Sequence, residues 1–373
     1  MKIGVITHWG SKDNYGQLLQ AFALQHFLRG LGHSPFLIRF NFLKFLATFR
    51  LCYCWKPRKC AGWIIHLLKY CSALIRDILH PRHFDAFQQN YMKLSELCYS
   101  DIKTLQEKYP EAEAYITGSD MVWGAAPPFP PFFLQFGQKE TLRLSYAAGM
   151  GFKYPATKKN IALLKEALSP FSFVSVREKQ GVEICNAAER NDAILVPDPV
   201  FLHTKDFYKN LFGLSSEIKS TLLIYLVGNR CHIPYDKINR FAAQKNLKIK
   251  FIASQGQTSC RGWEKIFPTP EEFMNELSQA AYVITNSFHG TAFSVIFQKN
   301  MLVIPLDHAD SRIDTVMQYF GIKSCIFNAD NENLNFYDLS QRTDIQSLIE
   351  ADISRVSQLL QSVFISADRS ETK

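Results

Sequence analysis

The stretch ITNSFHGTAF, residues 284–293, places a polar turn between a strand and a helix. Residues 281–284 are mostly apolar and include β-branched side chains, which is typical of a buried strand. Apolar residues at 291–297 recur at helical spacing. We therefore expect the turn to lie where a strand of an open α/β sheet ends, which is where such sheets bind ligands.

One imidazole, that of His289, stands at the predicted start of this helix. The first backbone N–H groups of a helix have no partner inside the helix and attract an anion. A titratable group beside an anion site suits acid–base chemistry on a phosphorylated or carboxylated substrate. The alternative is a histidine that only fills the turn, and its position alone favours neither interpretation.

The composition is that of a globular protein with 373 residues, of which 47% are hydrophobic and 20% are charged. This length exceeds what one core usually spans, so we expect two domains. The first residues, MKIGVIT, form too short an apolar run for a signal peptide. Nine cysteines without a framework spacing indicate a reducing compartment, so we expect a cytoplasmic protein.

A basic stretch at residues 41–90 carries much of the net charge of +8. Its lysines and arginines are mixed with aromatic and aliphatic residues, and no run is long and apolar enough to span a bilayer. This mixture suits the headgroups of an anionic membrane, at the inner face of the cytoplasmic membrane. The alternative is a helical insertion packed on its own domain. The aliphatic content argues against nucleic acid as a partner, and the spacing of Cys52, Cys54, Cys60 and Cys71 is not that of a zinc ribbon.

Residues 2–40 indicate the opening unit of a doubly wound sheet. A strand at 2–7, an amphipathic helix at 17–31 and a strand at 34–40 follow one another. The loop before the helix lacks the Gly-x-Gly-x-x-Gly fingerprint of dinucleotide binding. It offers the carboxylate, amide and phenol of DNY at residues 13–15 instead, which suits the recognition of hydroxyl groups.

Two more polar turns follow predicted strands. The turn after the strand at 114–117 contains Asp120, which either binds a hydroxyl group or caps a helix. Arg177 follows the strand at 173–176, where its planar guanidinium suits bidentate binding of phosphate or carboxylate. The alternative for Arg177 is an ion pair with a neighbour such as Glu178.

Two features concern how the domains are joined. Asp198 stands between two prolines, and we expect it to shape the path between the domains rather than to act in chemistry. The segment at residues 344–365 has a helical pattern, and we expect it to cross back to the first domain.

Seven short motifs occur in one order along the chain: Asp13-Asn14-Tyr15-Gly16, Gly118-Ser119-Asp120-x-x-Trp123, Ser145-Tyr146-Ala147-Ala148, Ser175-Val176-Arg177-Glu178, Asp198-Pro199, Ser287-Phe288-His289-Gly290-Thr291 and Arg312-Ile313-Asp314. With these motifs the chain resembles the polysaccharide pyruvyl transferase family, from its first strand to about residue 319. Each motif is weak alone, whereas seven in order are a specific signal. Within the family the chain most resembles bacterial members found with capsule and exopolysaccharide genes.

The resemblance implies an α/β fold of two Rossmann-like domains that face each other across a cleft, similar to GT-B glycosyltransferases. We expect an acceptor-side domain at residues 1–170, with the helical basic insertion at 41–90, and a donor-side domain at 171–345. Residues 346–373 would then form the helix that crosses back.

The resemblance also implies phosphoenolpyruvate as donor and a sugar diol as acceptor, giving a cyclic pyruvate ketal and inorganic phosphate. The sugar is expected on a polysaccharide or on a lipid-linked oligosaccharide precursor. Arg177 corresponds to one of the donor-binding arginines of the family, and His289 corresponds to its functional histidine. Some members carry an arginine at the position of Ser287, so another cation must replace it here, and Arg312 is the candidate.

The expected site combines catalytic, donor-binding and acceptor-binding residues. His289 would deliver and accept protons, and Asp13 would act as base for the attacking hydroxyl or hold the sugar. The donor side comprises Arg177, Ser287, Gly290, Thr291 and Arg312. The acceptor side comprises Asn14, Tyr15, Gly118, Ser119 and Asp120. Arginines can neutralise a leaving phosphate, so we expect neither a metal nor a cofactor.

Two other functions remain open from the sequence. The first is a GT-B glycosyltransferase that uses a nucleotide sugar, although no Glu-x6-Glu-like pattern for gripping a ribose stands near the second-domain site. The second is a non-catalytic relative that binds glycan, which the serine at position 287 keeps open.

Overall fold

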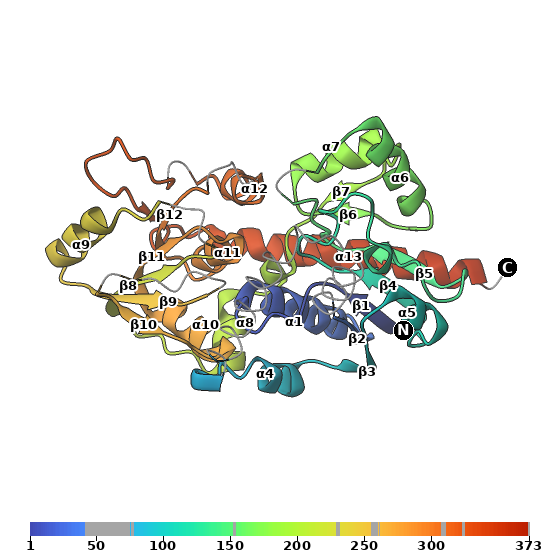
Figure 1. The fold of residues 1–373 in the computed structure, drawn as a ribbon, viewed down its shortest axis with the longest axis horizontal. Helices are drawn as coiled ribbons and strands as arrows, with labels where there is room; N and C mark the ends of the chain where they lie inside the picture. The colour runs from blue at the N-terminus through green and yellow to red at the C-terminus, as the bar shows by residue number, and fades with distance from the viewer. Residues whose placement is uncertain are drawn as a thin grey trace, which may run out of the picture.

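Two parallel sheets, each built from a different part of the chain, make up the protein. This computed structural model describes residues 1–41, 75, 78–151, 154–228, 232–254, 260, 262–306, 311–322 and 325–371. Figure 1 shows one sheet on each side of the molecule, with helices covering them. The predicted α/β fold with two Rossmann-like halves is therefore confirmed.

The first sheet has the strand order β3-β2-β1-β4-β5, and all its neighbouring strands are parallel. Its central strand is buried along almost its whole length, as expected for a parallel strand covered on both faces. The predicted strand–helix–strand opening is confirmed in β1, α1 and β2. The elements of this part are β1 (Lys2–Ile6), α1 (Tyr15–Gly30), β2 (Ser34–Phe40), α4 (Phe84–Tyr91), β3 (Leu94–Tyr99), α5 (Ile102–Glu107), β4 (Ala114–Thr117), β5 (Leu142–Ser145) and α6 (Lys158–Leu168).

Two very short strands extend this first sheet beyond β5. β6 (Ser175–Val176) pairs with β7 (Ile194–Leu195), and α7 (Lys179–Ala187) connects them. Isolated bridges from Leu144 to Phe173 and from Ala148 to Val176 join this pair to the first sheet. The domain boundary expected at residue 170 thus precedes β6 and β7. These strands are joined to the first sheet and not to the second.

The second sheet has the strand order β10-β9-β8-β11-β12-β13, in which only the edge strand β13 runs antiparallel. The predicted strand at 281–284 lies in β11, and the predicted helix begins three residues earlier than expected, at Phe288. The elements are α8 (Lys205–Phe212), β8 (Lys219–Tyr225), α9 (Tyr235–Gln244), β9 (Lys248–Ile252), β10 (Glu264–Ile266), α10 (Pro270–Gln279), β11 (Ala280–Thr285), α11 (Phe288–Ile296), β12 (Asn300–Val303), α12 (Ser311–Tyr319) and β13 (Tyr337–Asp338).

The last helix, α13 (Ile345–Glu371), connects the two halves. Ile345 and Ile349 near its start pack in the core around the second sheet. Leu360 and Phe364 farther along pack in a core cluster with residues of β1, α1 and β4. Figure 1 shows this helix, in red, running along the molecule from one sheet to the other. The helix therefore crosses back to the first sheet, as the sequence predicts.

One core cluster contains side chains from both halves. It includes Leu18 and Phe22 of α1 together with Phe273 of α10 and Phe293 of α11. Because this contact is apolar and buried, it fixes the start of α1 against the carboxyl edge of the second sheet.

Most of the basic segment at 41–90 lies outside the described residues, as do Cys52, Cys54, Cys60 and Cys71. Its expected contact with an anionic membrane and the inner-face location therefore stay predictions. None of the helices in the described ranges has the length and hydropathy that a transmembrane span requires.

Candidate active site

The turn from β11 to α11 is held by one serine and two threonine side chains. The Ser287 hydroxyl caps the helix by accepting a hydrogen bond from the Gly290 amide at 3.3 Å. The Ser287 amide donates to Thr285 Oγ1 at 3.0 Å, and Thr291 Oγ1 donates to the Ser287 carbonyl at 3.1 Å. A Cβ on Gly290 would lie 2.2 Å from Thr285 Oγ1, so this position has room only for glycine. These residues shape the helix start that presents His289.

His289 lies against the start of α1 in the other half of the molecule. Its side chain is nearly buried, and a Cβ on Gly16 would lie only 2.1 Å from its Nδ1 atom. Gly16 therefore leaves the space that the imidazole fills. Asn14 caps the same helix by accepting a hydrogen bond from the Gln17 amide at 3.2 Å.

Tyr15 does not face open space, although it was expected to bind the acceptor. It is fully buried, its ring stacks on Phe273 at 4.3 Å, and its hydroxyl donates to the Pro268 carbonyl at 2.6 Å. Tyr15 thus joins α1 to the second sheet. In the sequence, the phenol of Tyr15 suggested a polar role. Its burial could not be predicted, because its aromatic partners come from segments distant along the chain.

Arg177 lies at the centre of a buried cluster of three carboxylates. Its Nη1 is 2.7 Å from Asp198 Oδ2, its Nη2 is 3.4 Å from Asp120 Oδ1 and its Nε is 3.5 Å from Glu178 Oε1. The side chain is only 3% exposed. The ion pair with Glu178, which the sequence left as an alternative, is present. The charge of Arg177, the expected donor-binding arginine, is therefore already balanced by carboxylates of the protein.

Asp198 connects this cluster to His289. The Ser119 hydroxyl donates to its Oδ2 at 2.6 Å, and His289 Nε2 lies 3.7 Å from its Oδ1. Burial alone would raise the pKa of Asp198, but the imidazole, Arg177 and Ser119 together hold it well below its ordinary value. From its sequence context, Asp198 was expected only to shape the path between the domains. Its position between two prolines indicated a fixed backbone, but the partners come from three distant segments.

Glu178 and Arg312 lie beside the same cluster. Burial raises the pKa of Glu178, while Arg177 and Arg312 oppose this rise. The guanidinium carbons of Arg177 and Arg312 lie 4.7 and 5.8 Å from the centre of the Phe288 ring. The Phe288 ring thus lies close to two cations, one from each half of the molecule.

Asp120 has an unusual backbone conformation for a residue with a side chain. Its φ is 76°, in the left-handed region that favours glycine. Burial alone would raise the pKa of this carboxyl, but Arg177, His8 and His289 hold it below its ordinary value. A Cβ on Gly149 would lie 2.7 Å from the Asp120 carbonyl, and one on Gly118 would lie 3.2 Å from Thr7 Cβ. Close packing therefore holds the turn at 118–120.

Asp13 lies at the junction of the two halves and is partly exposed. Its carboxylate accepts a hydrogen bond from the Ser11 hydroxyl at 2.9 Å. Its carbonyl accepts one from the Ser254 hydroxyl at 2.5 Å, and Ser254 follows β9 of the second sheet. The structure thus places Asp13 beside the carboxyl edge of the second sheet.

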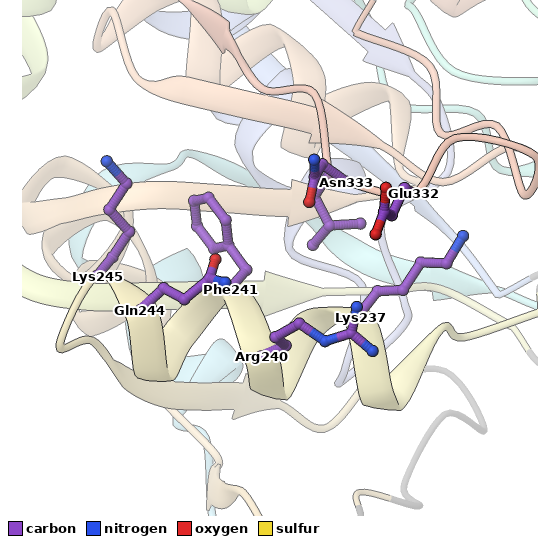
Figure 2. Close-up of a pocket in the computed structure, with 8 residues that line it drawn as sticks. Lys237, Arg240, Phe241, Gln244, Lys245, Glu332 and Asn333 are labelled. Atoms are coloured by element: carbon purple, nitrogen blue, oxygen red, sulfur yellow. The ribbon is translucent and has the colours of Figure 1, made fainter.

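An open pocket of about 390 Å³ lies away from all these residues. Figure 2 shows Lys237 and Arg240 of α9 opposite Glu332 and Asn333, with Lys245 just past the end of the helix. The Lys237 ammonium already donates to two backbone carbonyls at 2.7 Å. This pocket contains none of the expected site residues. Within the described ranges, no three His, Cys, Asp or Glu side chains gather in a way that could hold a metal ion.

The fold and the cluster define a class of protein: an α/β protein with a GT-B-like fold, in which charged residues of both halves meet at the start of a helix of the second sheet. The model of the polysaccharide pyruvyl transferase family matches residues 14–308, and the chain belongs to this family. It is therefore a pyruvyl transferase, as the resemblance implied.

Comparison with solved structures agrees on the fold. UDP-GlcNAc 2-epimerase from Neisseria meningitidis bound to UDP-GlcNAc has a TM-score of 0.50 and 11% identity, over 98% of this chain and 100% of that chain. The S. aureus MnaA–UDP structure has a TM-score of 0.49 and 12% identity, over 96% of this chain and 97% of that one. At such identities the likeness concerns the fold alone. No curated protein matches the sequence.

Proposed function

We propose that the protein transfers the pyruvyl group of phosphoenolpyruvate to two hydroxyl groups of one sugar, on a polysaccharide or a lipid-linked oligosaccharide precursor. The products are a cyclic pyruvate ketal and inorganic phosphate. The family supports pyruvyl transfer in general. The observation that carries the proposal is the position of His289, in the first turn of α11 and 3.7 Å from Asp198 beside Arg177.

The reaction needs protons to move at defined atoms. One proton is added to the methylene carbon of the donor, which becomes a methyl group and leaves a cationic carbon that the first sugar hydroxyl attacks. The carbon–oxygen bond to phosphate then breaks, the second hydroxyl attacks, and both hydroxyls lose their protons. In the proposal His289 delivers the proton to the methylene carbon, Asp13 accepts one from a sugar hydroxyl, and the departing phosphate takes the proton of the other hydroxyl.

The charged cluster suggests how the other residues contribute. Asp198 holds the His289 imidazole in place, and Arg177 keeps Asp198 ionised. Arg312, whose guanidinium carbon lies 5.8 Å from the centre of the Phe288 ring, is the cation we assign to the donor. The turn residues Ser287, Gly290 and Thr291 keep the helix amides in position for an anion. Ser119 and Asp120 remain the proposed contacts to the acceptor sugar.

The test is the release of phosphate from phosphoenolpyruvate in the presence of a panel of sugar and glycolipid acceptors, with mass spectrometry of the product. His289→Ala should abolish the reaction while the circular dichroism spectrum stays unchanged. His232→Ala, which alters an exposed histidine, is the matched control and should keep full activity. Turnover retained in His289→Ala would contradict the role of His289. Turnover with nucleotide sugars in place of phosphoenolpyruvate would contradict the assignment of phosphoenolpyruvate as the donor.

A further inference from the structure

Arg82 is a buried arginine whose guanidinium has no hydrogen-bond partner in the part of the chain that the structure describes. It lies in the short segment before α4 and is only 4% exposed. Its Nε, Nη1 and Nη2 atoms are all buried, and none has a hydrogen-bond partner among the described residues. A guanidinium keeps its charge at all ordinary pH values, and burying an unpaired charge is costly. A protein tolerates such a group where a ligand supplies the missing acceptors.

The surroundings of Arg82 are aromatic and polar. Its guanidinium carbon lies 5.3 Å from the centre of the Phe267 ring, and it lies close enough to Tyr15 and Tyr225 to influence the pKa of both phenols. The Tyr15 hydroxyl already has a hydrogen-bond partner, since it donates to the Pro268 carbonyl. The Tyr225 hydroxyl is also buried, and like the guanidinium it has no hydrogen-bond partner among the described residues.

Tyr225, beside Arg82, lies at the start of α11. It is the last residue of β8, and a Cβ on Gly290 would lie 3.1 Å from its ring. Burial raises the pKa of Tyr225 above its ordinary value, and the neighbouring hydroxyls of Ser254 and Ser287 oppose this rise. The phenol therefore keeps its proton and can donate it. The Tyr225 phenol and the first amides of α11 are thus neighbouring hydrogen-bond donors, and the Arg82 guanidinium lies near the phenol.

We propose that Arg82 and Tyr225 bind an oxyanion of the substrate, the phosphate or the carboxylate of the donor, at the amino terminus of α11. This subsite rests on the proposed function for the identity of the anion. Tyr225 ends β8 and lies against Gly290, whereas Arg312 lies beside the Phe288 ring. The donor would then contact two cations, Arg82 and Arg312.

The experiment measures binding by calorimetry, with inorganic phosphate in one arm and pyruvate in the other. For the anion that occupies the subsite, Arg82→Met should weaken binding about ten- to hundredfold, which is the usual worth of hydrogen bonds to a charged group. Tyr225→Phe removes only one hydroxyl and should weaken it about three- to tenfold. Arg29→Met, which alters an exposed arginine at the end of α1, is the matched control and should change neither arm.

A second measurement separates binding from folding. Removing a buried charge that has no protein partner should leave the melting temperature of the free protein unchanged or raised, so Arg82→Met should stay folded. A marked fall would show that Arg82 is a structural residue and would overturn the proposal, as would equal affinity of the wild type and Arg82→Met in both arms. Loss of phosphate binding identifies a phosphate subsite, and loss of pyruvate binding identifies a carboxylate subsite. Because neither arm requires turnover, binding that depends on Arg82 in a protein inactive with phosphoenolpyruvate would sustain the subsite and refute the proposed reaction.

Discussion

At the scale of single residues, Asp198 holds together groups from both halves of the molecule. It pairs with Arg177, accepts a hydrogen bond from Ser119 and faces His289. Replacing it by asparagine keeps the shape and removes the charge. We expect Asp198→Asn to lower the free energy of unfolding by about 3 kcal/mol, because Arg177 stays buried with one carboxylate fewer. Urea denaturation measures this change.

Asp192→Asn is the matched control for that substitution. Asp192 pairs with Arg190 at 2.8 Å, but its side chain is mostly exposed. Its loss should therefore cost less than about 1 kcal/mol. If the two variants lowered the free energy of unfolding equally, the buried cluster would stabilise the protein no more than the exposed pair does.

The same carboxylate predicts how stability depends on pH. The pKa of Asp198 is lower in the folded protein than its ordinary value of 3.8, so its stabilising effect is complete above that value. As the pH falls below about 4, protons must be added to a carboxylate that the folded state keeps ionised, and the effect is lost. The difference in unfolding free energy between wild type and Asp198→Asn should therefore be constant from about pH 7 to 5 and shrink below about pH 4. A difference that grows on acidification would contradict this assignment.

Gly16 tests whether the place of the imidazole depends on backbone space. An alanine Cβ would meet His289 Nδ1 at 2.1 Å, so Gly16→Ala should displace the ring, lower stability by about 1–3 kcal/mol and reduce turnover. Gly30→Ala, at the other end of α1, meets nothing within 4 Å and should be neutral or slightly stabilising. Thermal unfolding and phosphate release measure the two effects.

The sequence indicated which residues are polar and near strand ends, but not which of them pair. His289, Arg177 and Asp120 were expected at the site, and the structure brings them together. The depth of the carboxylate cluster around Arg177 could not be predicted, because its members come from positions 120, 178 and 198. Arg82 was seen only as part of a basic stretch, since burial of a single arginine leaves no pattern in sequence.

At the scale of secondary structure, local signals were sufficient for the β11–α11 unit. An apolar run and a helical repeat are properties of neighbouring residues, so both elements could be predicted. The helix begins earlier than expected because Ser287 caps it. The pairing of β6 and β7 with the first sheet was not predicted, because strands of two residues depend on partners far along the chain.

The cap on α11 gives a prediction at this scale. Ser287→Ala removes the acceptor for the Gly290 amide and should cost about 1 kcal/mol of stability. It should also raise the KM for phosphoenolpyruvate, because the first turn presents both His289 and the proposed anion site. Thr157→Ala removes the cap of α6, where Thr157 accepts from the Asn160 amide, and should cost as much stability without changing the KM. If Ser287→Ala and Thr157→Ala had the same KM for phosphoenolpyruvate, the cap on α11 would have no part in donor binding.

At the scale of the whole molecule, α13 fastens the second half to the first. Leu360 is buried in the cluster with residues of β1 and α1, whereas Ile365 on the same helix is exposed. Leu360→Ala should therefore lower the free energy of unfolding by about 2–5 kcal/mol, and Ile365→Ala by less than about 0.5 kcal/mol. Chemical denaturation of both variants measures the contrast, and similar values would show that the helix is not anchored there.

The path of α13 also bears on how the protein is made. Its residues Val356, Leu360 and Phe364 complete the core around β1 and α1, yet they follow the entire second sheet in the chain. During synthesis the amino-terminal half therefore leaves the ribosome long before the side chains that cover its apolar surface. That half must wait, partly uncovered, for α13 and is exposed to chaperones in the meantime.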